Sequence, residues 1–180
     1  KYYGELSSSY KENKPYSITD FFTSLVKKEP ASIFARFDNR LFENMLKSFS
    51  NVSFDQVIYC GLQTCAHLAY LRQEYPRAEH ILYQVNIEYL LYERIAKGQP
   101  NIFKKWAYLK QSDFMKIFEF NALNNVDKVL FISPKDEIFF RDKLSNLSST
   151  AMLPPSTKRP IYLDVPTNSD TICAYADWRW

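Results

Sequence analysis

The sequence predicts an α/β domain in which helices flank a parallel, Rossmann-like β-sheet. Short continuous apolar runs occur at 57–60, 81–85 and 128–132, and helical patterns separate them. Such runs are typical of strands that are covered on both faces, as in parallel sheets. Strands that alternate with helices indicate right-handed βαβ units. Residues 55–133 therefore form the expected core of the domain.

Two helices are expected before the first strand. Ser17 has the sequence of an N-cap, with Asp20 three residues later in a capping-box arrangement. Pro30 suits the first turn of a second helix, which is expected to run to about Phe49. The first helix has one apolar face, formed by Ile18, Phe21, Phe22, Leu25 and Val26.

Further helices are expected between and after the strands. Gly61 ends the first strand and Gly98 is a good residue to end a helix. The Ser-, Thr- and Pro-rich stretch 145–160 is typical of a linker. The expected helices are 62–74, 88–97, 101–124 and 134–144, and short strands are expected at 160–163 and 171–175.

Composition limits the classes of function. The chain of 180 residues is 46% hydrophobic, and its net charge of +3 comes from scattered basic residues, which argues against a nucleic-acid partner. It has only 3 glycines, so a Gly-rich phosphate loop is not expected. It has 3 cysteines and 2 histidines without a Cys-x-x-Cys pair, so we expect no metal site. No cofactor is expected.

The cysteines also indicate the compartment. Cys60 and Cys173 lie in apolar runs, which predicts buried, reduced thiols and a cytoplasmic location. No apolar run approaches the roughly 20 residues that cross a bilayer. The chain begins at Lys1 and ends at Trp180, and we expect it to be a piece of a larger protein.

An ordered series of motifs resembles the group 1 (family 4) glycosyltransferases. The family's "fDvV" strand resembles 54–59, and its "hHNvE" segment resembles 83–90. Its "aD.vi.vS..D" segment resembles 125–136, its "vvPp" stretch resembles 152–155, and the opening strand of its second domain resembles 172–180. The resemblance extends over most of residues 20–180.

The resemblance implies a fold of the GT-B type, in which two Rossmann-like domains face each other across a cleft. Residues 1–150 would be a partial acceptor-side (N-terminal) domain, and 151–180 a linker and the first strand of the second domain. The family's first strand would lie before Lys1, and its nucleotide-sugar site and paired glutamates after Trp180. Val85 departs from the family, which usually has histidine at this position.

Candidate acceptor-cleft residues follow the three predicted strands, because ligands of parallel sheets gather at the carboxyl ends of strands. All of them except Gly61 have a structural alternative. Glu88 is either a base or hydroxyl ligand or an acidic first-turn residue, and Asn86 either binds a sugar or caps its helix. The full set is Gly61, Asn86, Glu88, Ser133, Lys135 and Asp136.

The other candidates have structural alternatives that we favour. Ser133 and Asp136 have capping-box spacing. Lys135 either meets a diphosphate or is solvated. His67, in an apolar helix, is expected to be structural, and His80 is expected to be exposed. The cysteines have no evident activating base, so a catalytic thiol is not expected.

The start of the long predicted helix mixes aromatic and basic residues. This pattern predicts contact with an anionic membrane surface through Phe103, Lys104, Lys105 and Trp106. In the alternative, Trp106 and Leu109 pack inward and the lysines are solvated.

These observations lead to a transferase hypothesis. The chain would be part of a bacterial-type enzyme of polysaccharide biosynthesis that moves a sugar from a nucleotide-sugar donor to a glycan or lipid-linked acceptor, and it would be inactive alone. The alternatives are a non-catalytic interaction module with a degenerate transferase-like fold and an unrelated Rossmann-like binding domain.

Overall fold

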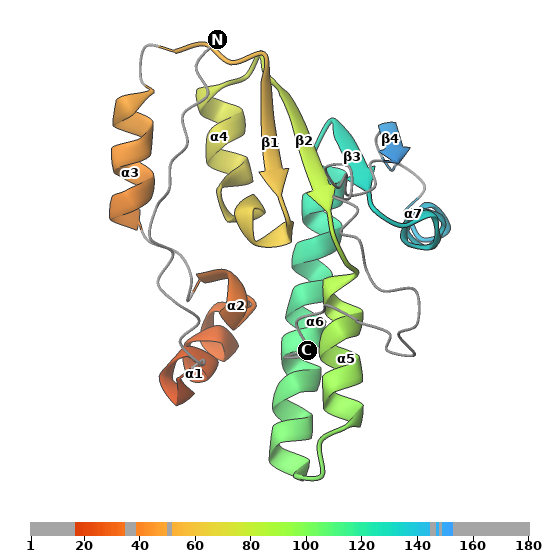
Figure 1. Ribbon diagram of the computed structural model, residues 1–180. Helices are drawn as coiled ribbons and strands as arrows, with labels where there is room; N and C mark the ends of the chain where they lie inside the picture. Colours follow the sequence, from red (N-terminus) through yellow and green to blue (C-terminus); the bar gives the residue numbers. More distant parts are fainter. Residues whose placement is uncertain (1–16, 35–38, 50–51, 145–146, 148, 153–180) are drawn as a thin grey trace, which may run out of the picture.

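A four-stranded parallel sheet forms the centre of the protein. The computed structural model describes residues 17–34, 39–49, 52–144, 147 and 149–152. The strands follow the order β1-β2-β3-β4, and each pairs in parallel with the next. The predicted α/β fold with a parallel, Rossmann-like sheet is confirmed (Figure 1). The strands are β1 (Gln56–Cys60), β2 (Glu79–Gln84), β3 (Lys128–Phe131) and β4 (Ser149–Met152).

Helices precede, connect and follow the first three strands. The described helices are α1 (Ile18–Lys27), α2 (Ala31–Phe34), α3 (Asn39–Ser48), η1 (Leu62–His67), α4 (Leu68–Glu74), α5 (Glu88–Lys97), α6 (Ile102–Asn124) and α7 (Pro134–Arg141). The predicted α5 and α6 are confirmed almost to the residue. The expected helix 62–74 begins as the 3₁₀ segment η1, and the expected helix 30–49 appears as α2 and α3, with 35–38 outside the described residues.

The predicted capping box at the start of α1 is confirmed. The Asp20 amide donates to Ser17 Oγ over 3.1 Å, and the Ser17 amide donates to Asp20 Oδ2 over 2.9 Å. Two of the amides that have no partner within the helix are thus satisfied.

The core lies where α6 and α7 pack on the central strands. Leu82 of β2 and Val129 of β3 are fully buried neighbours in the sheet register. Met115 and Leu123 of α6 and Phe140 of α7 are equally buried. β1 behaves differently, since Ile58 is 54% exposed and Cys60 is also exposed. The predictions that this strand is covered on both faces and that Cys60 is buried are therefore wrong, because β1 is an edge strand in the described sheet.

His80 is buried, so the prediction that it is exposed is wrong. It lies within β2 rather than before it, and only 1% of it is accessible. Its Nδ1 lies 2.9 Å from Tyr59 Oη on the adjacent strand, and its Nε2 lies 3.2 Å from the Tyr75 carbonyl oxygen. Both ring nitrogens thus have polar partners, which makes the burial of this polar ring tolerable.

The segment that the sequence predicts as a linker contains a strand. Residues 149–152 form β4, which pairs with β3 from Lys128 to Phe131. The side chain of Thr150 accepts a hydrogen bond from Arg141 and donates one to Glu137 of α7, so α7 and β4 are tied together. The strands predicted at 160–163 and 171–175, and Cys173, lie outside the described residues.

α5 and α6 form an antiparallel hairpin that extends well beyond the sheet (Figure 1). The chain passes from the sheet down α5 and returns along α6, whose last turns join the core. No described helix is long and apolar enough to cross a membrane.

Candidate ligand-binding site

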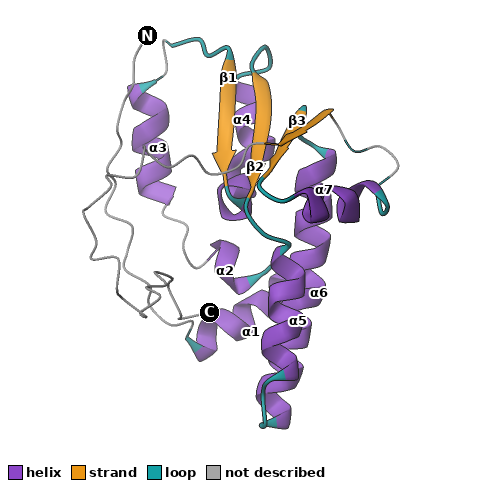
Figure 2. Ribbon diagram, turned by 45° about the vertical axis from the view of Figure 1, so that its right-hand side comes forward, coloured by secondary structure: helices purple, strands orange, loops and turns teal. Residues whose placement is uncertain are grey.

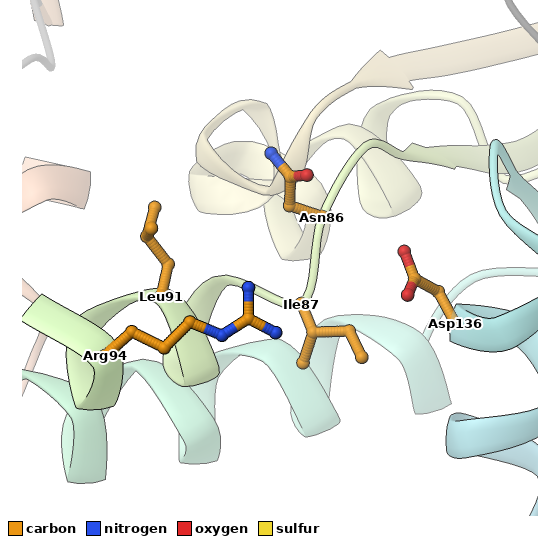
Figure 3. Close-up of a pocket in the computed structure, with 5 residues that line it drawn as sticks. All are labelled: Asn86, Ile87, Leu91, Arg94 and Asp136. Atoms are coloured by element: carbon orange, nitrogen blue, oxygen red, sulfur yellow. The ribbon is translucent and has the colours of Figure 1, made fainter. Parts of the chain in front are cut away.

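A pocket of about 430 Å³ opens at the carboxyl edge of the sheet. It lies between the start of α5 and the start of α7, and its polar side chains approach it from different sides (Figure 3). The lining residues are Asn86, Ile87, Leu91, Arg94 and Asp136.

The parallel arrangement of β2 and β3 explains why these residues meet. β2 ends at Gln84 and the chain reaches Asn86 before α5 begins. β3 ends at Phe131 and α7 begins at Pro134, so Asp136 lies in the first turn of α7. Because paired parallel strands end at the same edge, segments that are 50 residues apart in sequence lie side by side.

The pocket offers both donors and acceptors. Burial raises the pKa of the Asp136 carboxyl above its ordinary value, although the positive charge of Arg94 acts in the opposite direction. Within the described part of the chain, no ion pair joins Arg94 to Asp136. Asn86 adds an exposed amide, and Ile87 and Leu91 add apolar surface. A pocket of this kind suits a ligand that has both hydroxyl groups and an apolar ring face.

The buried carboxyl group of Glu119 binds the first turn of α5, and α5 forms one wall of the pocket. Glu119 of α6 is fully buried and accepts hydrogen bonds from the amides of Glu88 and Tyr89, at 3.0 and 3.2 Å. Gln84 Nε2 donates to Glu119 Oε1 over 2.5 Å and to the Asn86 carbonyl oxygen over 2.6 Å. The amides of the first turn of α5 thus obtain an acceptor from a neighbouring helix.

Burial governs the ionisation of Glu119. It raises the pKa of the carboxyl to about 8, even though the hydrogen bonds from the Glu88 and Tyr89 amides favour the carboxylate. At neutral pH the neutral acid is therefore the main form. Among the described residues, the buried Gln84 Oε1 has no hydrogen-bond partner. As a neutral acid, Glu119 has one proton to donate.

The predicted site residues all lie along one edge of the sheet, but the pocket brings together only Asn86 and Asp136. Gly61 is buried at the end of β1, where its φ of +86° favours glycine and its amide donates to the Tyr83 carbonyl oxygen. Glu88 begins α5, and its amide binds Glu119. Lys135 is exposed at the start of α7.

Two structural alternatives for these residues are wrong. Asn86 does not cap α5, because Ile87 occupies the N-cap position and the Glu119 carboxyl supplies the acceptor. Ser133 is the N-cap of α7, but its side chain makes no capping hydrogen bond, so it forms no capping box with Asp136. Asn86 and Asp136 are the two predicted residues that line the pocket, and neither side chain has a capping role.

Arg94 is the polar lining residue that the sequence analysis missed. It lies two turns into α5, away from the strand end where ligand residues were sought. The spacing of Ile87, Leu91 and Arg94 is i, i+4, i+7, which places the three on one face of a helix. That periodicity is the signal by which Arg94 could have been found.

His67 and Cys65, the other residues with chemically reactive side chains discussed above, are packed into the protein. His67 stacks on Phe42, and burial lowers the pKa of its ring to about 4. Cys65 is buried, which raises the pKa of its thiol to about 12. No group of three or more His, Cys, Asp or Glu that could hold a metal occurs in the ranges described above.

The alternative in which Trp106 and Leu109 pack inward is wrong. Trp106 is 48% exposed and Leu109 is 41% exposed. Phe103, Lys104 and Lys105 are also exposed at the far end of the α5–α6 hairpin.

No protein-family model, curated protein or solved structure matches this chain.

Proposed function

We propose that this chain is the acceptor-side domain of a sugar transferase. The intact enzyme would transfer a sugar from a nucleotide-sugar donor to a glycan or lipid-linked acceptor. One observation carries the proposal: the pocket at the carboxyl edge of a parallel sheet combines Asn86, Arg94 and Asp136 with apolar surface. The glycosyltransferase-like order of the sequence motifs supports the same conclusion.

The residues of the pocket suit the handling of an acceptor hydroxyl group. Asp136 is the acceptor of its proton, since a carboxyl whose pKa is raised by burial is a better base than a fully solvated one. Asn86 and Arg94 donate hydrogen bonds that orient the other oxygens of the acceptor. Ile87 and Leu91 contact the apolar face of the sugar ring.

The proposal is tested with the intact parent protein. Release of nucleoside diphosphate is measured with a panel of UDP- and GDP-sugars and a membrane lipid extract as the acceptor. Asp136→Asn is expected to lower kcat by about 100-fold or more, as for a lost general base. Asn86→Ala and Arg94→Ala are expected to raise the KM for the acceptor more than they lower kcat.

A matched control separates this effect from damage to the fold. Asp142→Asn changes an exposed carboxylate just after α7 and is expected to leave transfer unchanged. Equal activity of Asp136→Asn and the wild type would refute the assigned role of the pocket. Tight binding of a nucleotide sugar by the 180-residue chain, measured by calorimetry, would contradict the acceptor-side assignment.

A non-catalytic interaction module is the second candidate, and Val85 favours it. This residue follows β2 and is 41% exposed at the same edge of the sheet. Val85 has an alkyl side chain where the glycosyltransferases that the sequence resembles usually have histidine, whose ring can titrate. If the parent protein shows no transfer and Val85→His does not create any, the interaction module is the better proposal. Transfer by the wild-type parent excludes it.

A further inference from the structure

Seven large apolar side chains are exposed on two neighbouring helices, and we call this surface the tip face. Their exposed fractions range from 41% at Leu109 to 85% at Val26. The members are Ile18, Phe22 and Val26 of α1 and Ile102, Phe103, Trp106 and Leu109 of α6.

Aromatic contacts join the two halves of the tip face. The rings of Phe21 and Phe22 meet edge to face with centroids 5.9 Å apart, and those of Phe21 and Trp106 meet at 5.8 Å. Figure 2 shows α1 and α2 beside the α5–α6 hairpin. The apolar residues of α1 and of the start of α6 thus belong to one continuous surface.

A buried glutamine holds α1 in the orientation that exposes its apolar residues. Gln111 Nε2 donates to Ser24 Oγ over 2.5 Å, and Gln111 Oε1 accepts from the Ala31 amide over 2.8 Å. Ser24 is the fully buried residue of α1, whereas Ile18 and Val26 are 76% and 85% exposed. The helix therefore buries a polar side chain most deeply, keeps Phe21 and Leu25 half-buried and leaves three large apolar side chains outward, unlike a helix that serves only the core.

The charge beside the α6 part of the tip face is mainly positive, although α1 carries Asp20 and Lys110 pairs with Asp113 over 3.4 Å. Residues 97–110 contain four lysines and no acidic residue. Lys97, Lys104 and Lys105 are exposed. Apolar side chains flanked by lysines, with Trp and Phe among them, are typical of helices that lie in the interface of an anionic bilayer.

We propose that the tip face docks on the surface of an anionic lipid bilayer. The apolar residues of α1 and of the start of α6 enter the headgroup boundary, and the lysines contact lipid phosphates. An anionic bilayer fits better than a protein groove, because the apolar residues of α6 lie at the end of a hairpin and are accompanied by the exposed lysines Lys97, Lys104 and Lys105. The proposal concerns a surface away from the pocket and holds whether or not the chain belongs to a transferase.

The experiment measures binding of the full 180-residue chain to vesicles by co-sedimentation. Vesicles of phosphatidylcholine alone are compared with vesicles that contain about 30% phosphatidylglycerol. Binding is expected only with the anionic lipid and is expected to weaken as salt rises. Lys104→Glu with Lys105→Glu is expected to weaken binding at least about 25-fold, at about fivefold or more per lysine. Phe22→Ser and Phe103→Ser are each expected to weaken it about tenfold.

The control is an equally exposed pair on another helix. Ile138 of α7 is 59% exposed, and Lys143 is exposed just after α7. Ile138→Ser with Lys143→Glu is expected to leave vesicle binding unchanged. Binding that is equally weakened by this pair, or that does not depend on anionic lipid, would overturn the proposal. All variants replace exposed side chains, and circular dichroism checks that each keeps the helical content of the wild type.

Fluorescence locates the contact. The chain has 3 tryptophans, so Trp178→Phe with Trp180→Phe leaves Trp106 as the single tryptophan, which is excited selectively at wavelengths that tyrosine does not absorb. Anionic vesicles are expected to shift its emission to shorter wavelength and to shield it from iodide. Shielding that already exists without lipid would show that protein covers the tip face. Concentration-dependent dimers that Phe103→Ser abolishes would assign the face to self-association. Either result would overturn the proposal.

Discussion

Replacing Glu119 with glutamine tests how a buried carboxyl group supports the pocket. Two effects on its ionisation oppose each other. Burial favours the neutral acid, whereas the amides of Glu88 and Tyr89, at 3.0 and 3.2 Å, favour the carboxylate. The pKa of Glu119 is raised to about 8, so burial outweighs the amides. Glutamine has nearly the shape of the neutral acid and does not titrate.

The raised pKa gives the pH dependence a definite sign. Between pH 4.5 and about 8, the folded chain holds a proton on Glu119 that the unfolded chain has released. The free energy of unfolding therefore falls as the pH rises through this window, by about 1.4 kcal/mol per pH unit. From about pH 5.5 to about pH 7.5 the loss is about 3 kcal/mol. The Glu119→Gln variant lacks this loss, so its stability relative to the wild type should rise by that amount.

The assay is urea unfolding followed by circular dichroism at both pH values. All other titrating groups are shared by the two chains and cancel in the difference. Glu119→Ala is the matched control, because it does not titrate, leaves the two amides without their acceptor and removes one of the two acceptors of Gln84 Nε2. It should be about 2 to 4 kcal/mol less stable than Glu119→Gln at both pH values.

Two results would refute this reasoning. A difference between wild type and Glu119→Gln that stays constant from about pH 5.5 to about pH 7.5 would mean that the pKa of Glu119 is not raised. A difference that grows in favour of the wild type as the pH rises toward 4.5 would mean that the amides bind a carboxylate. In that case the attraction of the helix N-terminus for negative charge would exceed the cost of burial.

Three further predictions concern the surroundings of the site. The ring of His67 should stay neutral down to about pH 4 in an NMR titration, and the stability of the wild type relative to a non-titrating His67→Gln variant should fall as the pH drops from 6.5 toward that value, because only the unfolded wild-type chain takes up the proton and the opposite contribution of Glu119 cancels in this comparison. Replacing Gln111 with leucine should cost about 2 to 4 kcal/mol, because the Ala31 amide loses its buried acceptor, and trypsin should then cut faster around α1. Iodoacetamide should modify exposed Cys60 long before buried Cys65, as peptide mass mapping of the native chain would show.

Local sequence patterns predicted most of the fold, because most strands can be recognised from a short apolar run without knowledge of their long-range contacts. The apolar runs 57–60, 81–85 and 128–132 lie within two residues of β1, β2 and β3. β4 escaped prediction because 149–152 is a short run among Ser, Thr and Pro, and its stability comes from pairing with β3. The partners that bury His80 are equally nonlocal, since Tyr59 is on the neighbouring strand.

In the candidate site, too, some residues could be predicted from the sequence and others could not. Asn86 and Asp136 could be predicted, because topology alone brings the ends of parallel strands together. Arg94 could not be predicted from strand ends, since it lies two turns along α5. The role of Glu119 depends on the packing of α6 against α5, which places its carboxyl at amides 30 and 31 residues earlier in the chain.

The long helix α6 connects the two proposed surfaces. Near its end, Glu119 fixes the first turn of α5, which adjoins the pocket, and at its start Ile102 and Trp106 belong to the tip face. At 1.5 Å per residue, Ile102 and Glu119 are about 25 Å apart along the axis. Exposed apolar residues follow α6 from Ile102 to Leu109, and Ile117 is exposed further along, so a docked helix would be tilted toward the bilayer rather than upright. Under both proposals, the pocket then lies less than about 25 Å from the headgroups, a height that suits a sugar carried on a lipid.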